Sequence, residues 1–219
     1  MLKQLRTTHP ILFGLLVEVL FFGTLFLSDL IFSVVLLVSG VDLTGLDSYL
    51  YSGLQELLGT LVVLLVLKRT GRIGLLRWRG SGFFNGLLVG MYPLVMIGYS
   101  IFGALMFGRP DDAELLPPVR ILTFLLSMMM VGVAEELTFR AIVAQTLLEH
   151  YGTSRGGVWK ACLVSGALFG AAHLTNLMSS EPFGVLMQCL FAGALGSLFA
   201  AIYFRTGNIW VTVFLHGMM

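Results

Sequence analysis

The sequence is short of charge. Asp, Glu, Lys and Arg make up 11% of its 219 residues, whereas a soluble globular domain carries about 25%. Hydrophobic residues make up 57%, so too few polar side chains remain to cover a surface that faces water. This deficit excludes a soluble domain and predicts an all-α, polytopic membrane protein. The length suits a single membrane domain over residues 1–219, embedded in a lipid bilayer.

Net charge and cysteine are also scarce. A formal net charge of +1 gives no electrostatic reason to bind nucleic acid. The two cysteines, Cys162 and Cys189, both lie inside apolar stretches. They are therefore predicted to be small buried hydrophobic residues, not a disulfide or a metal knuckle.

Long apolar segments dominate what is present. A spanning helix needs about 20 predominantly apolar residues, and this rule predicts a bundle of about seven to eight transmembrane helices. The candidate segments are 11–38, 49–67, 83–107, 119–148, 158–178, 183–204 and 208–219. The fourth turns amphipathic after Glu135 and could be two helices, and the last is too short to span alone.

Basic residues concentrate on one side of this arrangement. If the chain crosses at each segment, ten of the thirteen Lys and Arg fall on the side of the N-terminus: Lys3, Arg6, Lys68, Arg69, Arg72, Arg77, Arg79, Arg155, Lys160 and Arg205. Arg109 and Arg120 fall on the other side and Arg140 in the core. The positive-inside rule then predicts a cytoplasmic N-terminus, and the compact layout suggests a bacterial cell membrane.

Small residues recur at helical spacing in two segments. Gly166 and Gly170 are four residues apart, as are Gly193 and Ser197. Because helices in lipid associate through close backbone contact at such rows, the fifth and sixth segments are predicted to pack tightly together.

Three charges end the apolar part of the fourth segment, in VGVAEELTFR. Ionisable residues inside a membrane are costly and are by default candidates for a functional site. Glu136 and Arg140 are four apart, so on a helix they share one face and can neutralise each other. Glu135 is rotated by about 100° and is left to face a cavity, where it could act as a general base. A purely structural ion cluster is the alternative.

Two histidines strengthen the functional interpretation. His173 and His216 lie in the fifth and seventh segments, and with Glu135 they could converge inside a bundle. Such a set could activate water directly or hold a zinc ion. Asn176 and Asn208 could donate hydrogen bonds to an oxyanion, or could simply bond between helices. A serine–histidine dyad is disfavoured because Leu163 stands where G-x-S-G needs glycine.

These motifs together resemble the CPBP family of intramembrane endopeptidases, named for CAAX processing and bacteriocin processing and also called the ABI family. The resemblance rests on Glu135-Glu136-x-x-x-Arg140, Phe169-x-x-x-His173, and a late histidine, His216, in a short helix. It covers the last 95 or so residues, so residues 119–219 would form the catalytic core and residues 1–118 would be spans without motifs.

The resemblance implies a helical bundle with an intramembrane cavity that cleaves a hydrophobic or lipidated peptide or protein. It implies that Glu135 and His173 activate the water and that His216 stabilises the oxyanion. Glu136, Arg140, Phe169 and Asn176 would support them. Whether a metal such as zinc takes part, bound by Glu135, His173 and His216, stays open.

The sequence departs from the family at one point. The family's last motif has an asparagine four residues after the late histidine, and the sequence ends at Met219 before that position. Another donor could complete the oxyanion site, the chain could be shortened, or the protein could be an inactive scaffold acting in bacteriocin immunity or peptide binding. A small transporter or channel with buried carboxylates is a further alternative.

Overall fold

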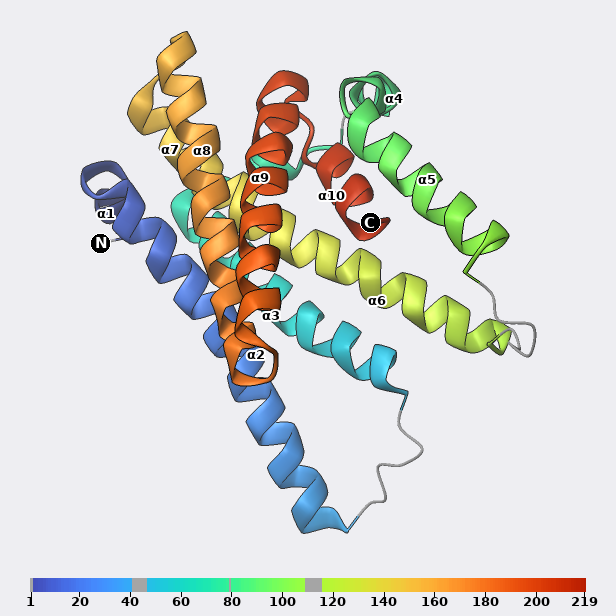
Figure 1. Cartoon of the computed structure of the whole chain (residues 1–219). Helices are drawn as coiled ribbons and strands as arrows, with labels where there is room; N and C mark the ends of the chain where they lie inside the picture. Colours follow the sequence, from blue (N-terminus) through green and yellow to red (C-terminus); the bar gives the residue numbers. More distant parts are fainter. Residues whose placement is uncertain (1, 41–46, 79, 109–115) are drawn as a thin grey trace.

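The computed structural model of the chain describes residues 2–40, 47–78, 80–108 and 116–219, and every regular element in these ranges is a helix. The elements are α1 (Leu2–Thr8), α2 (Pro10–Ser39), α3 (Ser48–Thr70), a 3₁₀ turn η1 (Ile73–Leu76), α4 (Gly80–Val89), α5 (Met91–Met106), α6 (Pro118–Glu136), a π-helix η2 (Leu137–Ala144), α7 (Gln145–Tyr151), α8 (Arg155–Ala172), a 3₁₀ helix η3 (His173–Met178), α9 (Pro182–Thr206) and α10 (Ile209–Gly217). Figure 1 shows their arrangement.

The predicted membrane bundle is confirmed. The described ranges contain five helices long and apolar enough to cross a membrane, or six if the bent pair α4–α5 forms one span. All seven predicted segments are helical, but two of them are not single straight spans. The segment 83–107 bends by 77° between α4 and α5, and 208–219 is the short α10.

The bend at Gly90 has a packing cause. An added Cβ at Gly90 would lie 2.5 Å from Leu215 Cδ1, and one at Gly86 would lie 2.4 Å from Val211 Cγ2. These two glycines therefore let α4 lie directly against α10. Hydropathy alone could not predict the bend, because both arms of the pair are equally apolar.

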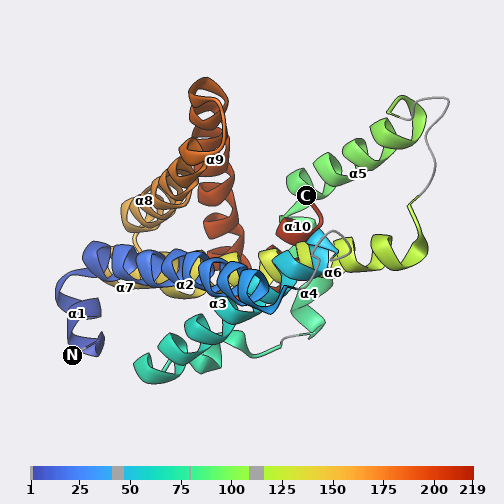
Figure 2. The same ribbon diagram turned by 90° about the horizontal axis from the view of Figure 1, so that it is seen from below.

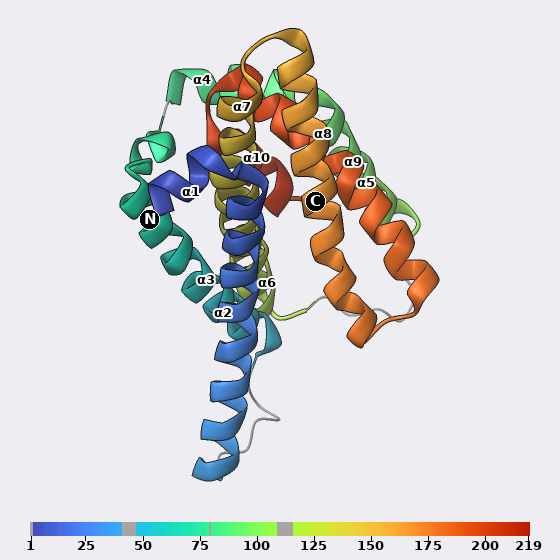
Figure 3. The ribbon, with the colours of Figure 1, turned by 90° about the vertical axis from the view of Figure 1, so that its left-hand side faces the viewer.

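The tight contact between α8 and α9 is also confirmed. An added Cβ at Gly166 would lie 2.0 Å from Ser197 Oγ, and one at Gly170 would lie 2.5 Å from the Cys189 carbonyl oxygen. The two helices lie side by side in Figure 3, and in Figure 2 they project together away from α2 and α6. Both cysteines are free, with Cys162 buried and Cys189 partly buried.

Helices α3 and α6 lie together and run in the same direction. Asp47 caps α3, accepts hydrogen bonds from the backbone N–H groups of Leu50 and Tyr49, and accepts another from Thr123 Oγ1 of α6 at 3.2 Å. The backbone bond from Leu50, followed by that from Tyr49, holds the pKa of Asp47 below its usual range. Further along, an added Cβ at Gly53 would lie 3.5 Å from Ser127 Cα.

The chain segments that carry most basic residues gather at one end of the bundle. The N-terminal helix, the α3–α4 connection, the α7–α8 turn and the α9–α10 turn lie in the upper part of Figure 1. Arg79 and Arg109, which belong to the charge count, lie outside the described residues.

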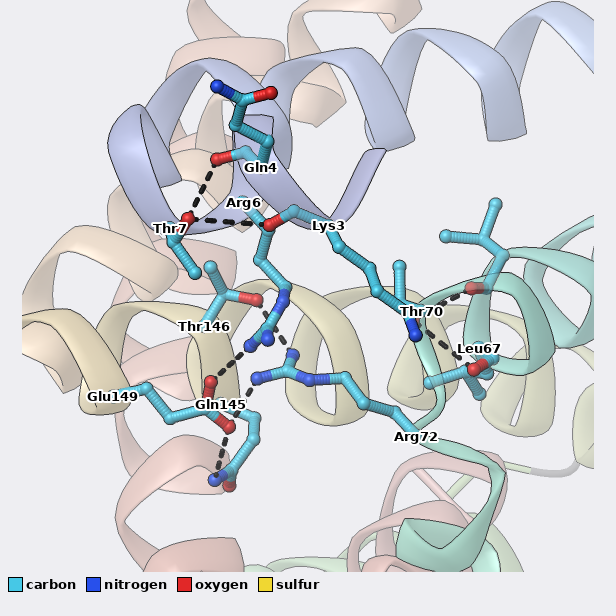
Figure 4. A network of polar contacts seen from close by, with 11 residues as sticks. Lys3, Gln4, Arg6, Thr7, Leu67, Thr70, Arg72, Gln145, Thr146 and Glu149 are labelled. Atoms are coloured by element: carbon cyan, nitrogen blue, oxygen red, sulfur yellow. Dashed lines mark hydrogen bonds and ion pairs between the residues drawn. The ribbon is translucent and has the colours of Figure 1, made fainter. Parts of the chain in front are cut away.

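An ionic network ties this end together (Figure 4). Glu149 of α7 pairs with Arg6 of α1 and with Arg72, which follows α3 and also donates to Thr146 Oγ1 at 2.8 Å. Arg72 is only 8% exposed. Glu149 therefore links three helices that the hydrophobic pattern does not connect.

Candidate active site

Glu135 and Glu136 end α6 at the point where the helix widens into the π-helix η2. Such π segments are rare in proteins, and those that do occur are often found at functional sites. Glu136 Oε2 lies 3.2 Å from Arg140 Nε, and the two side chains are 0% and 1% exposed. The pairing expected from their spacing is therefore present, inside the bundle.

Aromatic rings enclose the arginine. The Arg140 guanidinium carbon lies 4.5 Å from the centre of the Phe169 ring and 5.4 Å from that of Phe199. A guanidinium over a ring face is held by a cation–π interaction, which is strongest where water is excluded. Phe169 thus helps to hold the Arg140 guanidinium in the position where it pairs with Glu136.

His216 joins the two glutamates. Its Nδ1 lies 2.7 Å from Glu136 Oε1 and its Nε2 lies 3.4 Å from Glu135 Oε2. The expected pairing of Glu136 with Arg140 is therefore present, but Glu135 is not left without a partner. Glu135 does line a hollow, but the imidazole bridges it to Glu136. Sequence spacing could not reveal this, because His216 arrives on a helix 80 residues later.

Glycines bring α10 to that position. An added Cβ at Gly132 of α6 would lie 2.9 Å from the Gly217 nitrogen and 2.9 Å from the Val213 carbonyl oxygen. Asn208 caps α10 by accepting a hydrogen bond from the Trp210 backbone N–H at 3.1 Å, and it is buried. Asn208 therefore acts as a cap, and it is not among the residues that line the two hollows described below.

His173 lies at the end of α8, where the chain continues into η3. Its Nδ1 lies 2.9 Å from the Phe169 carbonyl oxygen. A carbonyl oxygen can only accept, so Nδ1 carries the hydrogen and the neutral ring keeps its Nε2 lone pair as an acceptor. The ring is therefore oriented as a base requires.

Two hollows meet at His173. The larger, of about 390 Å³, lies among α5, α8, α9 and α10, and Phe169, His173, Gln188 and His216 are in its wall. The smaller, of about 230 Å³, is lined by Glu135, His173, Asn176 and Gln188 among others. The structure thus brings the three predicted catalytic residues around two hollows that share His173.

Asn176 is engaged with a residue that sequence reasoning missed. Its Nδ2 donates to Gln188 Oε1 at 2.8 Å, so this amide hydrogen bond is already used. Gln188 of α9 lines both hollows. Its one available sequence signal is that it is an amide within a long apolar helix.

Glu56 is the second missed residue. It lies on α3, one helical turn past Gly53, and it is close enough to Glu135 and His216 for their charges to interact. Its Oε2 is buried and has no hydrogen-bond partner in the described ranges. The site therefore extends into the N-terminal spans, in which the sequence showed no motif.

A zinc site is not assembled by these positions. Within the described ranges, no three His, Cys, Asp or Glu side chains lie close enough together to hold a metal ion. Glu135, His173 and His216 surround the hollows without meeting at one point, so these residues do not fit a zinc ion as they are placed.

The fold and the site define a polytopic helical membrane protein with a glutamate–histidine centre inside the bundle. Residues 117–219 match the family described as type II CAAX prenyl endopeptidase Rce1-like. A protein of Bacillus subtilis (strain 168), named "Putative membrane peptidase YdiL", is 30% identical over 185 residues, which cover 78% of this chain and 68% of that protein. No solved structure matches the chain. The chain belongs to the Rce1-like family of CAAX-type membrane proteases, which confirms the family that the motifs indicated.

Proposed function

We propose that the protein is an intramembrane endopeptidase that hydrolyses a peptide bond with water activated by Glu135 and His173. The observation that carries this proposal is the placement of Glu135, His173 and His216 around two adjoining hollows. Membership of a membrane protease family supports it.

The reaction follows from the hydrogen-bonding groups. A water held near Glu135 and the His173 Nε2 loses a proton to the carboxylate while its oxygen attacks the carbonyl carbon of the substrate. The carbonyl electron pair moves onto oxygen and creates an oxyanion. When the C–N bond breaks, the proton passes from Glu135 to the leaving amine.

His216 has an electrostatic part in this scheme. Its two ring nitrogens face the oxygens of Glu136 and Glu135. Ionised carboxylates only accept hydrogen bonds, so this geometry favours an imidazolium with a hydrogen on each nitrogen. Its positive charge would stabilise the developing oxyanion, with Glu136 and Arg140 fixing the ring.

The setting is proposed from the fold. The gathering of basic segments at one end supports a cytoplasmic N-terminus, in a cell membrane that we propose to be bacterial. A substrate that enters an intramembrane cavity must be apolar or lipidated. We propose one membrane domain in which residues 119–219 carry the main catalytic groups.

Cleavage of two internally quenched peptides by purified protein in detergent tests the proposal. One peptide carries a farnesylated cysteine in a C-terminal CAAX sequence, and the other is the same peptide without the lipid. We expect wild-type protein to cleave at least one of them and Glu135→Gln to lose activity by at least about 100-fold.

Glu18→Gln is the matched control. Glu18 is a buried glutamate on an apolar helix, with an unpartnered Oε1 within the described ranges, and it lines neither hollow. This variant should cleave at the wild-type rate. Full activity of Glu135→Gln would refute the mechanism, and a folded wild-type protein that binds but never cleaves would support the alternative of a binding scaffold.

A further inference from the structure

Gln188 is a polar residue at a position where a residue with only a packing role would be apolar. The surrounding residues of α9 that face outward are apolar: Phe183, Leu186, Met187, Leu190 and Phe191. An amide withdrawn from water into hydrocarbon costs free energy unless its hydrogen bonds are made. Gln188 nevertheless lies in this helix, where it is exposed and forms part of the walls of both hollows.

Asn176 fixes which end of the Gln188 amide is used. Asn176 Nδ2 donates to Gln188 Oε1 at 2.8 Å. The oxygen is therefore the end bound to η3, and the two N–H groups on Nε2 are directed away from that bond. Within the described ranges, Nε2 makes no hydrogen bond of its own.

Three other polar side chains around the hollows have their hydrogens occupied. His216 faces two carboxylates, and His173 donates from Nδ1 to the Phe169 carbonyl oxygen. Thr175 donates its hydroxyl hydrogen to the Ala172 carbonyl oxygen at 2.9 Å.

Three side chains therefore keep an unused donor in the part of the wall that the structure describes: Gln188, Ser100 and the second N–H of Asn176 Nδ2. Ser100 lines only the larger hollow, and Asn176 lines only the smaller one. Gln188 lines both hollows together with His173, so it is the donor beside the proposed site of attack.

We propose that Gln188 is a further catalytic residue, which donates an Nε2–H hydrogen bond to the carbonyl oxygen of the scissile peptide bond. This inference rests on the proposed function. As the water oxygen bonds to carbon, the carbonyl electron pair moves onto oxygen, and the amide stabilises that charge without transferring a proton. Asn176 is a positioning residue, because it acts through the orientation of Gln188.

The decisive substitution is Gln188→Glu. It keeps the shape of the side chain and an oxygen that accepts from Asn176, but an ionised carboxylate cannot donate to the substrate. A residue with only a structural role would tolerate this change. With the peptide that wild-type protein cleaves, we expect kcat to fall roughly 100-fold, as for the loss of one oxyanion donor, while KM changes by less than about threefold.

Three more variants complete the experiment. Gln188→Met should lose kcat to a similar extent, and it replaces Gln188→Glu as the test if the charged variant does not fold. Asn176→Asp should also reduce kcat, because a carboxylate would accept from Gln188 Nε2 and occupy the donor. Thr24→Val, on α2 and outside both hollows, removes the same kind of hydroxyl-to-carbonyl hydrogen bond and should keep the wild-type kcat.

The outcomes separate the two claims. If Glu135→Gln is inactive but a folded Gln188→Glu or Gln188→Met variant keeps kcat within about threefold of wild type, the role of Gln188 is overturned and the proposed function stands. If wild-type protein cleaves neither peptide, the proposed function is overturned and this inference falls with it. A loss confined to KM would also overturn it, because a donor to the oxyanion acts in the transition state.

Discussion

Replacing Glu136 with glutamine should destabilise the protein far more than the same change at Glu135. Glu136 and Arg140 are 0% and 1% exposed, so Glu136→Gln leaves a buried guanidinium without its carboxylate. Breaking a buried ion pair in this way costs about 3–5 kcal/mol. Glu135 is 17% exposed and reaches His216 at 3.4 Å, a weaker contact whose loss should cost about 1 kcal/mol or less.

Thermal unfolding in detergent, followed by tryptophan fluorescence, measures the difference. In a domain of this size 1 kcal/mol corresponds to about 2–4 °C in Tm, so we expect Glu136→Gln to lower Tm by roughly 6–20 °C and Glu135→Gln by at most about 4 °C. The double variant Glu136→Leu with Arg140→Met removes both charges and should recover most of the loss. Equal Tm shifts for the two single variants, or no recovery in the double variant, would refute the assigned ion pair.

Three other predictions concern the scaffold and the site. Gly132→Leu should abolish cleavage, because its side chain would collide with Gly217 and move His216 away from the glutamates; cleavage at the wild-type rate would contradict this. Glu149→Gln should lower the unfolding free energy by about 1 kcal/mol or less, since Glu149 is 44% exposed, and the loss should shrink in 1 M salt. Dialysis against a chelator should leave the cleavage rate unchanged, and one zinc per chain that disappears in His216→Ala would contradict the metal-free scheme.

The sequence was informative where one physical effect dominates. Hydropathy and length are sufficient to locate the five long spans within the described ranges, since a helix must cover the bilayer with apolar residues. The rows of Gly166 and Gly170 predicted the α8–α9 contact, because nothing but a missing side chain permits so close an approach. The pairing of Glu136 with Arg140 followed from helical spacing.

Other features depend on tertiary placement and could not be predicted. The bend at Gly90 exists because α10 lies against α4, and a glycine in a membrane helix is too common to indicate a bend. Glu56 and Gln188 are single polar residues in apolar helices. Their importance depends on which helices pack beside them. The residues next to them in the sequence do not indicate this.

The π-helix alters the geometry that a regular α-helix would give to the segment VGVAEELTFR. The expected geometry assumed a regular α-helix through VGVAEELTFR, but the widened turn begins at Leu137, directly after the two glutamates. Glu136 still reaches Arg140 because both side chains are long. The pair therefore survives the change of helix type, whereas the strict division between a structural and a free glutamate does not.

The family match begins at residue 117, but the site does not. Glu56 approaches Glu135 and His216 from α3, and Gly53 and Asp47 hold that helix against α6. A family pattern consists of residues that the chemistry requires at given positions, and in this chain the matched residues lie after residue 117. The bundle must also exclude water and lipid from the charged centre, and many apolar sequences can do this. The N-terminal spans therefore carry no motif even though one of their carboxylates lies beside the proposed catalytic base.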